Sequence, residues 1–265
     1  MKTLFKSQSV IALRGGLQSD VMLVAVLRVG VVIVSLLGWI AGSHVSPLIP
    51  TPYQTVRILL RELFTSGGFR SPLGFSLQPI MEGFGIAAVA GVTVGLWLGR
   101  SQFWRDVLGP PLNGLFAVPR IIVYPVLLAA FGVTMTSEMW LAVIAAFFPI
   151  AINAAAGTRA VSPVLSKLAT SFNCSTLQSV RKIYLPAALP AIMVGIRLGF
   201  SGAFVTVTGA EIYASRGGLG QILSQAYQLQ QYSRLFAAVL LLTLIALAGN
   251  VLLLAFERRA KVAAD

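Results

Sequence analysis

Residues 235–256 read LFAAVLLLTLIALAGNVLLLAF and contain no charged side chain. A bilayer core about 30 Å thick is crossed by about 20 apolar residues in a helix, so this stretch predicts a transmembrane helix. The surrounding chain has 265 residues, of which 57% are hydrophobic and 11% charged, and a mean hydropathy of +0.85. Soluble domains carry about 25% charged residues. The composition therefore excludes soluble, disordered and fibrous proteins and indicates a membrane protein.

Five further apolar runs precede this segment, at residues 21–41, 76–98, 112–131, 139–156 and 188–210. Their lengths indicate helices, because the strands of a membrane barrel would alternate over segments of about ten residues. The first run is longer than the roughly 7–15 residues of a signal-peptide core, so we interpret it as an uncleaved span. The predicted fold class is all-α, a polytopic membrane protein with six transmembrane helices within residues 21–256.

The basic residues are unevenly distributed over the segments between these runs. Twelve Lys and Arg lie in residues 1–20, in alternate loops and in the tail 257–265, whereas five lie in the remaining loops. Short loops rich in Lys and Arg stay in the cytoplasm, so both termini are predicted to be cytoplasmic. The basic residues orient the helices in the membrane and attract anionic lipid, and these two roles account for the net charge of +12. No basic stripe with interleaved aromatic residues suggests nucleic acid as a partner.

On the predicted outer side, residues 51–67 place apolar side chains at helical spacing, with Arg57, Arg61 and Glu62 elsewhere on the turn. This pattern predicts an amphipathic helix on the outer, periplasmic surface of the membrane. A packed connector between the first two spans fits the same pattern, and the two interpretations do not exclude each other.

The sequence offers no catalytic or metal-binding constellation. Cys174 and His44 are each the only residue of their type, so neither a Cys/His metal site nor an internal disulfide has enough members. The chain also lacks a Gly-Lys dipeptide, which the phosphate-binding loop of an ATPase requires. We therefore assign no catalytic residue and no cofactor, and we expect any ATP-driven work to come from a partner.

Residues 162–186 lie on the predicted cytoplasmic side, and their pattern predicts two short helices joined by a turn. Ser162 is placed to cap the first, and Leu165, Leu168 and Phe172 form its apolar face. Ser175 followed by Gln178 is a capping-box pattern for the second helix.

Between these helices lies Asn173, which tolerates positive φ better than other residues apart from Gly. Leu185-Pro186 is expected to end the segment before the fifth span. By patterning alone, a docking element and an interfacial membrane helix fit this loop equally well.

The stretch from Lys167 to Asn173, followed by Ile183-Tyr184-Leu185-Pro186, resembles the EAA loop of ABC-importer permeases, whose pattern is Glu-Ala-Ala, three residues, Gly and later Ile-x-Leu-Pro. The similarity extends along most of the chain beyond residue 20, and its pattern is that of the nitrate, sulfonate, taurine and bicarbonate branch. It is carried by Gly99-Arg100-Ser101, Pro119-Arg120 with Pro125, Phe131-Gly132, Phe148-Pro149-Ile150 with Asn153 and Gly157, Gly195-Ile196-Arg197-Leu198, Ala210-Glu211 and Gly218-Leu219-Gly220.

The resemblance implies the type I ABC-importer permease architecture in a bacterial inner membrane. It implies a second copy of the chain, two ATPase subunits that hold ATP and Mg, and an extracytoplasmic binding protein that delivers a small, anionic solute. The ATPase-docking residues implied are Leu165, Lys167, Leu168, Ala169, Thr170, Ser171, Phe172, Asn173, Cys174, Ser175, Leu185 and Pro186.

Three positions depart from the family pattern: Lys167 replaces an acidic residue, Leu168 an alanine and Asn173 the glycine. Asn keeps the turn accessible, but a reversed charge on a docking surface should weaken binding unless the partner compensates. We therefore expect an acidic residue opposite Lys167 on the partner ATPase.

Polar residues inside the apolar runs are costly and so are candidates for function. We assign Arg120, Asn153 and Arg197, together with Glu211 at the outer end of the fifth run, to the translocation pathway. The alternatives that stay open are lipid contact for Arg120, a structural role for Arg197, and polar contacts between helices for Asn153 and Glu211. Arg28 is expected to extend to the membrane surface. Gly91 and Gly95 form a small-xxx-small pair that indicates helix packing.

Other functions remain compatible with these patterns. The alternatives are an importer of a vitamin precursor of the pyrimidine or riboflavin type, an ATP-independent secondary transporter or channel, and a membrane scaffold. A secondary transporter would need paired ionisable residues across spans, and Glu82 is the only acidic residue clearly within a run. A scaffold gives no reason for the two-helix loop.

Overall fold

The computed structural model describes residues 2–65, 67–162, 164, 165, 167 and 171–264. These residues form helices and connecting turns, with no strand among them. The chain divides into two units, residues 1–57 and 58–265, which are considered separately. The all-α fold class predicted from the sequence is confirmed for the described part of the chain.

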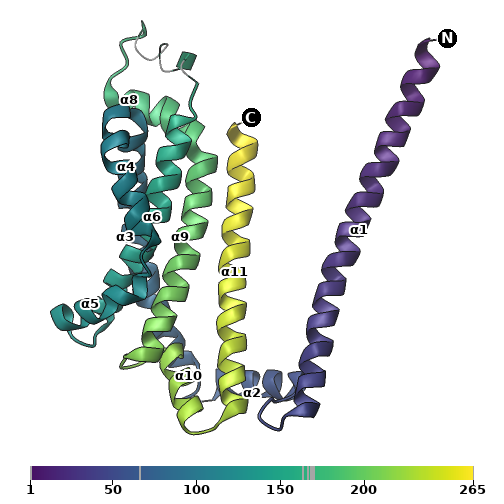
Figure 1. The fold of residues 1–265 in the computed structure, drawn as a ribbon, viewed down its shortest axis with the longest axis vertical. Helices are drawn as coiled ribbons and strands as arrows, with labels where there is room; N and C mark the ends of the chain where they lie inside the picture. Colours follow the sequence, from purple (N-terminus) through teal and green to yellow (C-terminus); the bar gives the residue numbers. More distant parts are fainter. Residues whose placement is uncertain (1, 66, 163, 166, 168–170, 265) are drawn as a thin grey trace. The chain divides into compact units, whose positions relative to one another are not determined.

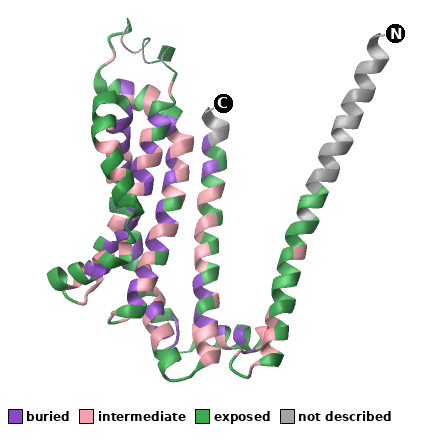
Figure 2. Cartoon of the chain, viewed as in Figure 1, coloured by how far each residue is buried: buried purple, intermediate pink, exposed green. Residues whose placement is uncertain are grey.

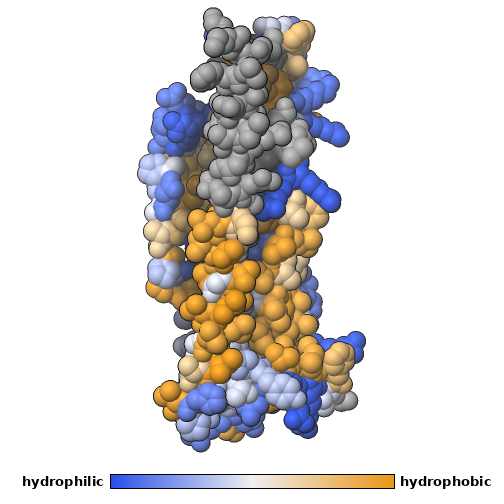
Figure 3. All heavy atoms as spheres, turned by 90° about the vertical axis from the view of Figure 1, so that its right-hand side faces the viewer, coloured by the Kyte–Doolittle hydropathy of each residue, from blue (hydrophilic) through white to orange (hydrophobic). Residues whose placement is uncertain are grey.

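Unit one consists of the long helix α1 (Lys2–Val45) and the start of α2 (Pro52–Phe64). From Met22 onward the large apolar side chains of α1 are exposed, and Figure 3, in which α1 faces the viewer, shows hydrophobic residues along this described part. At the end of α1, the indole Nε1 of Trp39 donates a 3.0 Å hydrogen bond to the carbonyl of Pro50. An apolar helix with this exposure is suited to contact with lipid.

The second unit contains the remaining helices (Figure 1). They are α3 (Arg70–Arg100), α4 (Gln102–Ala117), η1 (Arg120–Val123), α5 (Tyr124–Phe131), α6 (Met135–Arg159), α8 (Thr176–Ser179), η2 (Val180–Tyr184), α9 (Leu185–Tyr213), α10 (Leu219–Gln228) and α11 (Tyr232–Ala264). Within the described residues, five helical segments are long and apolar enough to cross a membrane, and a bent pair makes a sixth candidate.

Helices α3, α6 and α9 pack closely and form the centre of this unit (Figure 2). Small residues permit the close approach: a Cβ at Gly95 of α3 would lie 2.5 Å from the Cβ of Ala154, and one at Gly91 would lie 2.9 Å from Ile150. The prediction that Gly91 and Gly95 serve helix packing is confirmed. On the other side of α6, Gly195 and Gly199 of α9 meet α6 in the same manner.

The third apolar run, expected as one continuous span over 112–131, is divided in the structure. Helix α4 ends at Ala117, and the segment from Arg120 to Phe131 continues at an angle of 88°. Val118 and Pro119 have extended ψ angles of 130° and 111°. The proline explains the break, because its ring disfavours helical geometry in the preceding residue.

Leu185-Pro186 also behaves differently from expectation, because the chain stays helical through it. A single helical segment runs from Thr176 to Tyr213. The turn Val180–Tyr184 is a π-helix, in which the amide of Leu185 donates to the carbonyl of Val180. Pro186 directly follows this π-turn, and because it has no N–H, one intrahelical hydrogen bond is missing there.

Candidate functional site

The loop at residues 162–186 has the turn and the capping box that its sequence predicts, although Leu185-Pro186 does not end the helix that follows. Asn173 adopts a φ of +47°, the left-handed conformation expected of it. The capping box is also present: Ser175 N donates to Gln178 Oε1 at 2.9 Å, and Gln178 N donates to Ser175 Oγ at 3.3 Å. Leu168, Ala169 and Thr170 lie outside the described residues.

This loop presents exposed apolar side chains next to basic ones. Phe172 and Leu177 are each 76% exposed, and Leu165 is 40% exposed. Lys167, Ser171 and Ser175 are also exposed, whereas Cys174 is half-buried. Apolar side chains with this exposure in a polar loop are typical of a surface that contacts another protein or the membrane.

The base of the loop is anchored in the bundle. Ser179 is buried, and Val180 packs on a cluster that includes Leu96, Ala154 and Ile192. The guanidinium of Arg100, at the end of α3, lies 5.2 Å from the ring centroid of Tyr184. Helices α8, η2 and α9 form one helical segment, so the second half of the loop is continuous with α9.

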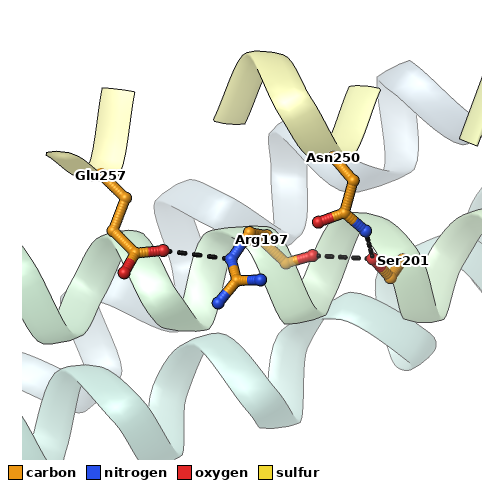
Figure 4. Close-up of polar contacts among 4 residues, drawn as sticks. All are labelled: Arg197, Ser201, Asn250 and Glu257. Carbon is orange, nitrogen blue, oxygen red and sulfur yellow. Dashed lines mark hydrogen bonds and ion pairs between the residues drawn. The ribbon is translucent and has the colours of Figure 1, made fainter. Parts of the chain in front are cut away.

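Arg197 of α9 forms an ion pair with Glu257 of α11, with Nε donating to Oε2 at 3.0 Å (Figure 4). About one turn along α9 from Arg197, Ser201 Oγ accepts a 2.9 Å hydrogen bond from Asn250 Nδ2 of α11. The Glu257 side chain is 5% exposed, so the residue that begins the predicted tail is part of the packed bundle. This arrangement supports the structural alternative for Arg197.

Glu211, near the other end of α9, is 1% exposed and holds the turn that leads into α10. Its Oε2 accepts hydrogen bonds of 2.8 Å from Ser76 Oγ and from the amide of Gly220. Ser76 Oγ in turn accepts from the amide of Leu219 at 2.9 Å. The carboxylate thus connects α3, α9 and α10.

Arg120 and Asn153, the two other predicted pathway residues, donate hydrogen bonds to nearby backbone carbonyls. Arg120 Nη2 donates to the carbonyl of Phe116 at the end of α4, and its guanidinium lies 4.5 Å from the Phe116 ring. Asn153 Nδ2 donates to the carbonyl of Pro149 in its own helix. Each of the four predicted pathway residues therefore has a different set of partners, and no contact joins them in the described structure.

A cavity of about 520 Å³ lies between α4 and α6, at the end of α6 from which the loop emerges. Arg105, Asn113 and Arg159 supply its polar lining. Sequence analysis did not identify these residues, because Arg105 and Arg159 contributed only to the count of basic residues that orients the chain. Their spacing carries no further signal.

A bundle of apolar helices, one of them continuous with an exposed loop, is the architecture of a polytopic membrane protein. A family model described as "Binding-protein-dependent transport system inner membrane component" matches residues 91–262. The chain belongs to this family of ABC-importer permeases; it is a multi-pass inner-membrane transport subunit rather than an enzyme, and it works with an ATPase and a binding protein.

Relatives of known function place the chain in the branch that the sequence resembles. It is 31% identical to the taurine transport system permease protein TauC of Escherichia coli, over 81% of this chain and 80% of that protein. It is 30% identical to the nitrate import permease protein NrtB of Synechocystis, over 78% and 76%. The branch fits the predicted ABC importer and not the vitamin-precursor or ATP-independent alternatives.

The fold is shared with a chain of the MetNI methionine ABC transporter, solved in inward-facing conformations. The TM-score is 0.62 at 18% identity, over 76% of this chain and 95% of that one. This likeness confirms the predicted permease architecture.

Proposed function

We propose that this permease imports a small organic or inorganic anion of the sulfonate, nitrate or bicarbonate type. The relatives named above are permeases for taurine and nitrate, and a third, CmpB of Synechococcus elongatus, is a bicarbonate permease 30% identical to this chain. Basic residues support the same class of solute, because Arg105 and Arg159 line a cavity without an acidic residue in its lining.

Coupling to ATP hydrolysis takes place at residues 162–186. The observation that carries this assignment is the unbroken helical segment from Thr176 to Tyr213, which joins the exposed loop to a membrane-spanning helix. Phe172 and Leu177 give the ATPase an apolar contact, and movement of the loop moves α9 as a lever. Such rigid elements carry the switch between two packings of a transporter.

The functional assembly has two copies of this chain, two ATPase subunits on the cytoplasmic loops and one external binding protein. A closed two-fold arrangement lets one gene product supply both halves of the pathway. Both termini lie in the cytoplasm, as the distribution of Lys and Arg predicts. Residues 51–67, which contain α2, lie at the periplasmic surface.

Leu177→Asp tests the docking surface without disturbing the fold. The side chain is exposed, and an acidic residue in the first turn of α8 suits the helix dipole. Burying an unpaired carboxylate against a partner is strongly unfavourable, so we expect recovery of ATPase subunits with the tagged permease to fall about tenfold or more. Uptake into proteoliposomes should fall in parallel.

Leu229→Asp is the matched control, because Leu229 is 66% exposed in the turn between α10 and α11. This variant should recover ATPase subunits at the wild-type ratio. Wild-type recovery by the Leu177 variant as well would refute docking at this loop. Recovery of the wild-type permease without ATPase subunits would refute the importer assembly itself.

A further inference from the structure

The cavity between α4 and α6 combines positive charge with apolar walls. Its lining consists of Leu98, Arg105, Gly109, Leu112, Asn113, Ala151, Ile152, Ala155, Ala156, Arg159 and Ala160. Helix α4 contributes no buried residue to the fold (Figure 2), so the cavity is bounded on this side by a half-exposed helix. The volume of about 520 Å³ falls in the range of roughly 300–1,000 Å³ typical of small-molecule sites.

Neither arginine in this cavity is neutralised by an acidic residue in the described part of the chain. The ion pairs found there join Arg197 to Glu257 and Arg234 to Glu62. Arg105 uses Nη1 for a 3.2 Å hydrogen bond to the carbonyl of Gly99, which fixes the side chain and leaves its other donors available. Arg159 lies in the last turn of α6, where a cation suits the helix dipole.

The rest of the lining restricts the class of ligand. Asn113 donates Nδ2 to the carbonyl of Gly109, which leaves its side-chain oxygen as an acceptor. Leu98, Leu112 and Ile152 form an apolar wall. A planar inorganic ion satisfies the arginines but leaves this wall in contact with water, whereas an oxyanion with a short apolar tail covers both surfaces.

We propose that this cavity binds a small organic oxyanion of the sulfonate class. The oxygens accept hydrogen bonds from the guanidinium groups of Arg105 and Arg159, and the tail packs against Leu112 and Ile152. This inference rests on the proposed import of an anion and narrows the solute to an alkanesulfonate type. A phosphodiester headgroup of an anionic lipid presents the same chemistry, so the test includes both sources.

The position of the cavity connects it to the coupling loop. Arg159 is the last residue of α6 and Ala160 is its C-cap. Residues 162–186 follow almost directly in the sequence. A displacement of the loop by the ATPase therefore moves one wall of the cavity relative to α4. The site is placed to hold the anion before release into the cytoplasm and to lose affinity when the loop moves.

Binding of butane-1-sulfonate to the complete permease–ATPase complex tests this assignment. The complex is placed in phosphatidylcholine nanodiscs without nucleotide, and binding is followed by isothermal titration calorimetry. Arg105→Gln and Arg159→Gln should each weaken binding by about tenfold or more, the loss expected for one charge-assisted hydrogen-bonding group. Arg159→Lys, which keeps the charge but not the planar fork, should recover part of the affinity.

The matched control is Arg258→Gln, an exposed arginine on α11 outside the cavity, which should bind as the wild type does. Nanodiscs containing phosphatidylglycerol form the second arm, with bound lipid measured by native mass spectrometry. Loss of phosphatidylglycerol in both glutamine variants, without sulfonate binding to the wild type, assigns the oxyanion to lipid and refutes the sulfonate class.

Unchanged binding of both ligands in folded Arg105 and Arg159 variants would overturn the site. Uptake by the wild-type importer, assembled with its binding protein, separates this result from the proposed function. If the wild type takes up an anion while binding in the variants is unaltered, the binding site in the cavity is refuted and the proposed import of an anion stands. Failure of the wild type to transport any anion refutes the proposed function.

Discussion

Arg197 and Glu257 are separated by 60 residues in the sequence, yet Nε of the arginine donates to the glutamate at 3.0 Å. The pair fastens the end of α11 to α9, the helix that continues into the coupling loop. We expect Arg197→Gln to lower the free energy of unfolding by about 1.5–3 kcal/mol, because Glu257 is left buried with a weaker donor.

A double-mutant cycle with Glu257→Gln, measured by thermal melting in detergent, separates the pair from its surroundings. The two substitutions should cost less together than the sum of the single changes, with a coupling of about 0.5–3 kcal/mol. Strict additivity would mean that the ion pair contributes nothing measurable. A selective change in anion affinity without loss of stability would instead favour the pathway role predicted from the sequence.

The close contact between α3 and α6 should leave no room for a larger side chain at Gly95. A Cβ there would lie 2.5 Å from the Cβ of Ala154 and 2.6 Å from the carbonyl oxygen of Ala151, so Gly95→Val must push the helices apart. We expect a loss of about 1–3 kcal/mol, the usual cost of overpacking. Gly85→Val is the control on the same helix, because no atom lies within 4 Å of its added Cβ. Equal melting temperatures for the two variants would contradict tight packing of α3 against α6 at Gly95.

Removal of the Ser76 hydroxyl should loosen the start of α10. Ser76→Ala deprives both Glu211 Oε2 and the amide of Leu219 of a buried partner. We expect a loss of about 1–3 kcal/mol in stability and faster hydrogen exchange at Leu219 and Gly220. Ser35→Ala, which removes an exposed hydroxyl bound to its own helix, is the control. Unaltered exchange at both amides would show that the network is dispensable.

Asn173 should accept glycine but not a β-branched residue. Its φ of +47° lies in the left-handed region, which costs most L-residues about 1–2 kcal/mol. Asn173→Gly should therefore keep ATPase recovery and uptake near wild type, whereas Asn173→Val should reduce both. The ratio of ATPase to permease after co-purification measures the effect, and equal ratios for the two variants would mean that the turn does not shape the docking surface.

Lys167→Glu should weaken the complex with the native ATPase. Lys167 is exposed on the loop and stands where the family pattern has an acidic residue, so the partner is expected to present an acid opposite it. The substituted glutamate would then face this acidic residue of the ATPase, and the two negative charges would repel each other. Docking and transport that stay unchanged or improve would show that the ATPase has not adapted at this position. A parallel measurement at higher salt checks the electrostatic origin.

Hydropathy and charge predicted the type and approximate position of the membrane helices, since these depend on composition over about 20 residues. Local rules also predicted the turn at Asn173 and the cap at Ser175. The break at Val118-Pro119 was missed because the apolar run continues through it without a change in hydropathy. Pro186 was expected to end a helix, but a π-turn before it accommodates the ring.

Partners far apart in the sequence could not be predicted in this way. Glu257 was placed in the tail because a charged residue after an apolar run normally marks the membrane surface, yet it is buried against α9. Arg105 and Arg159 have the same sequence signature as residues that only orient the chain. Pairing and cavity formation depend on helix packing, which a single sequence does not specify.

The glycine contacts between α3 and α6 also restrict how the transporter works. Two backbones in van der Waals contact over several turns cannot slide past each other without losing that fit, and lipid cannot replace it. We therefore expect these two helices to move as one rigid body. Helix α4, by contrast, has no buried residue and is joined to η1 and α5 through the extended residues Val118 and Pro119. We therefore expect opening and closing of the permease to combine a movement of α4 against this pair of helices with the lever movement proposed for α9.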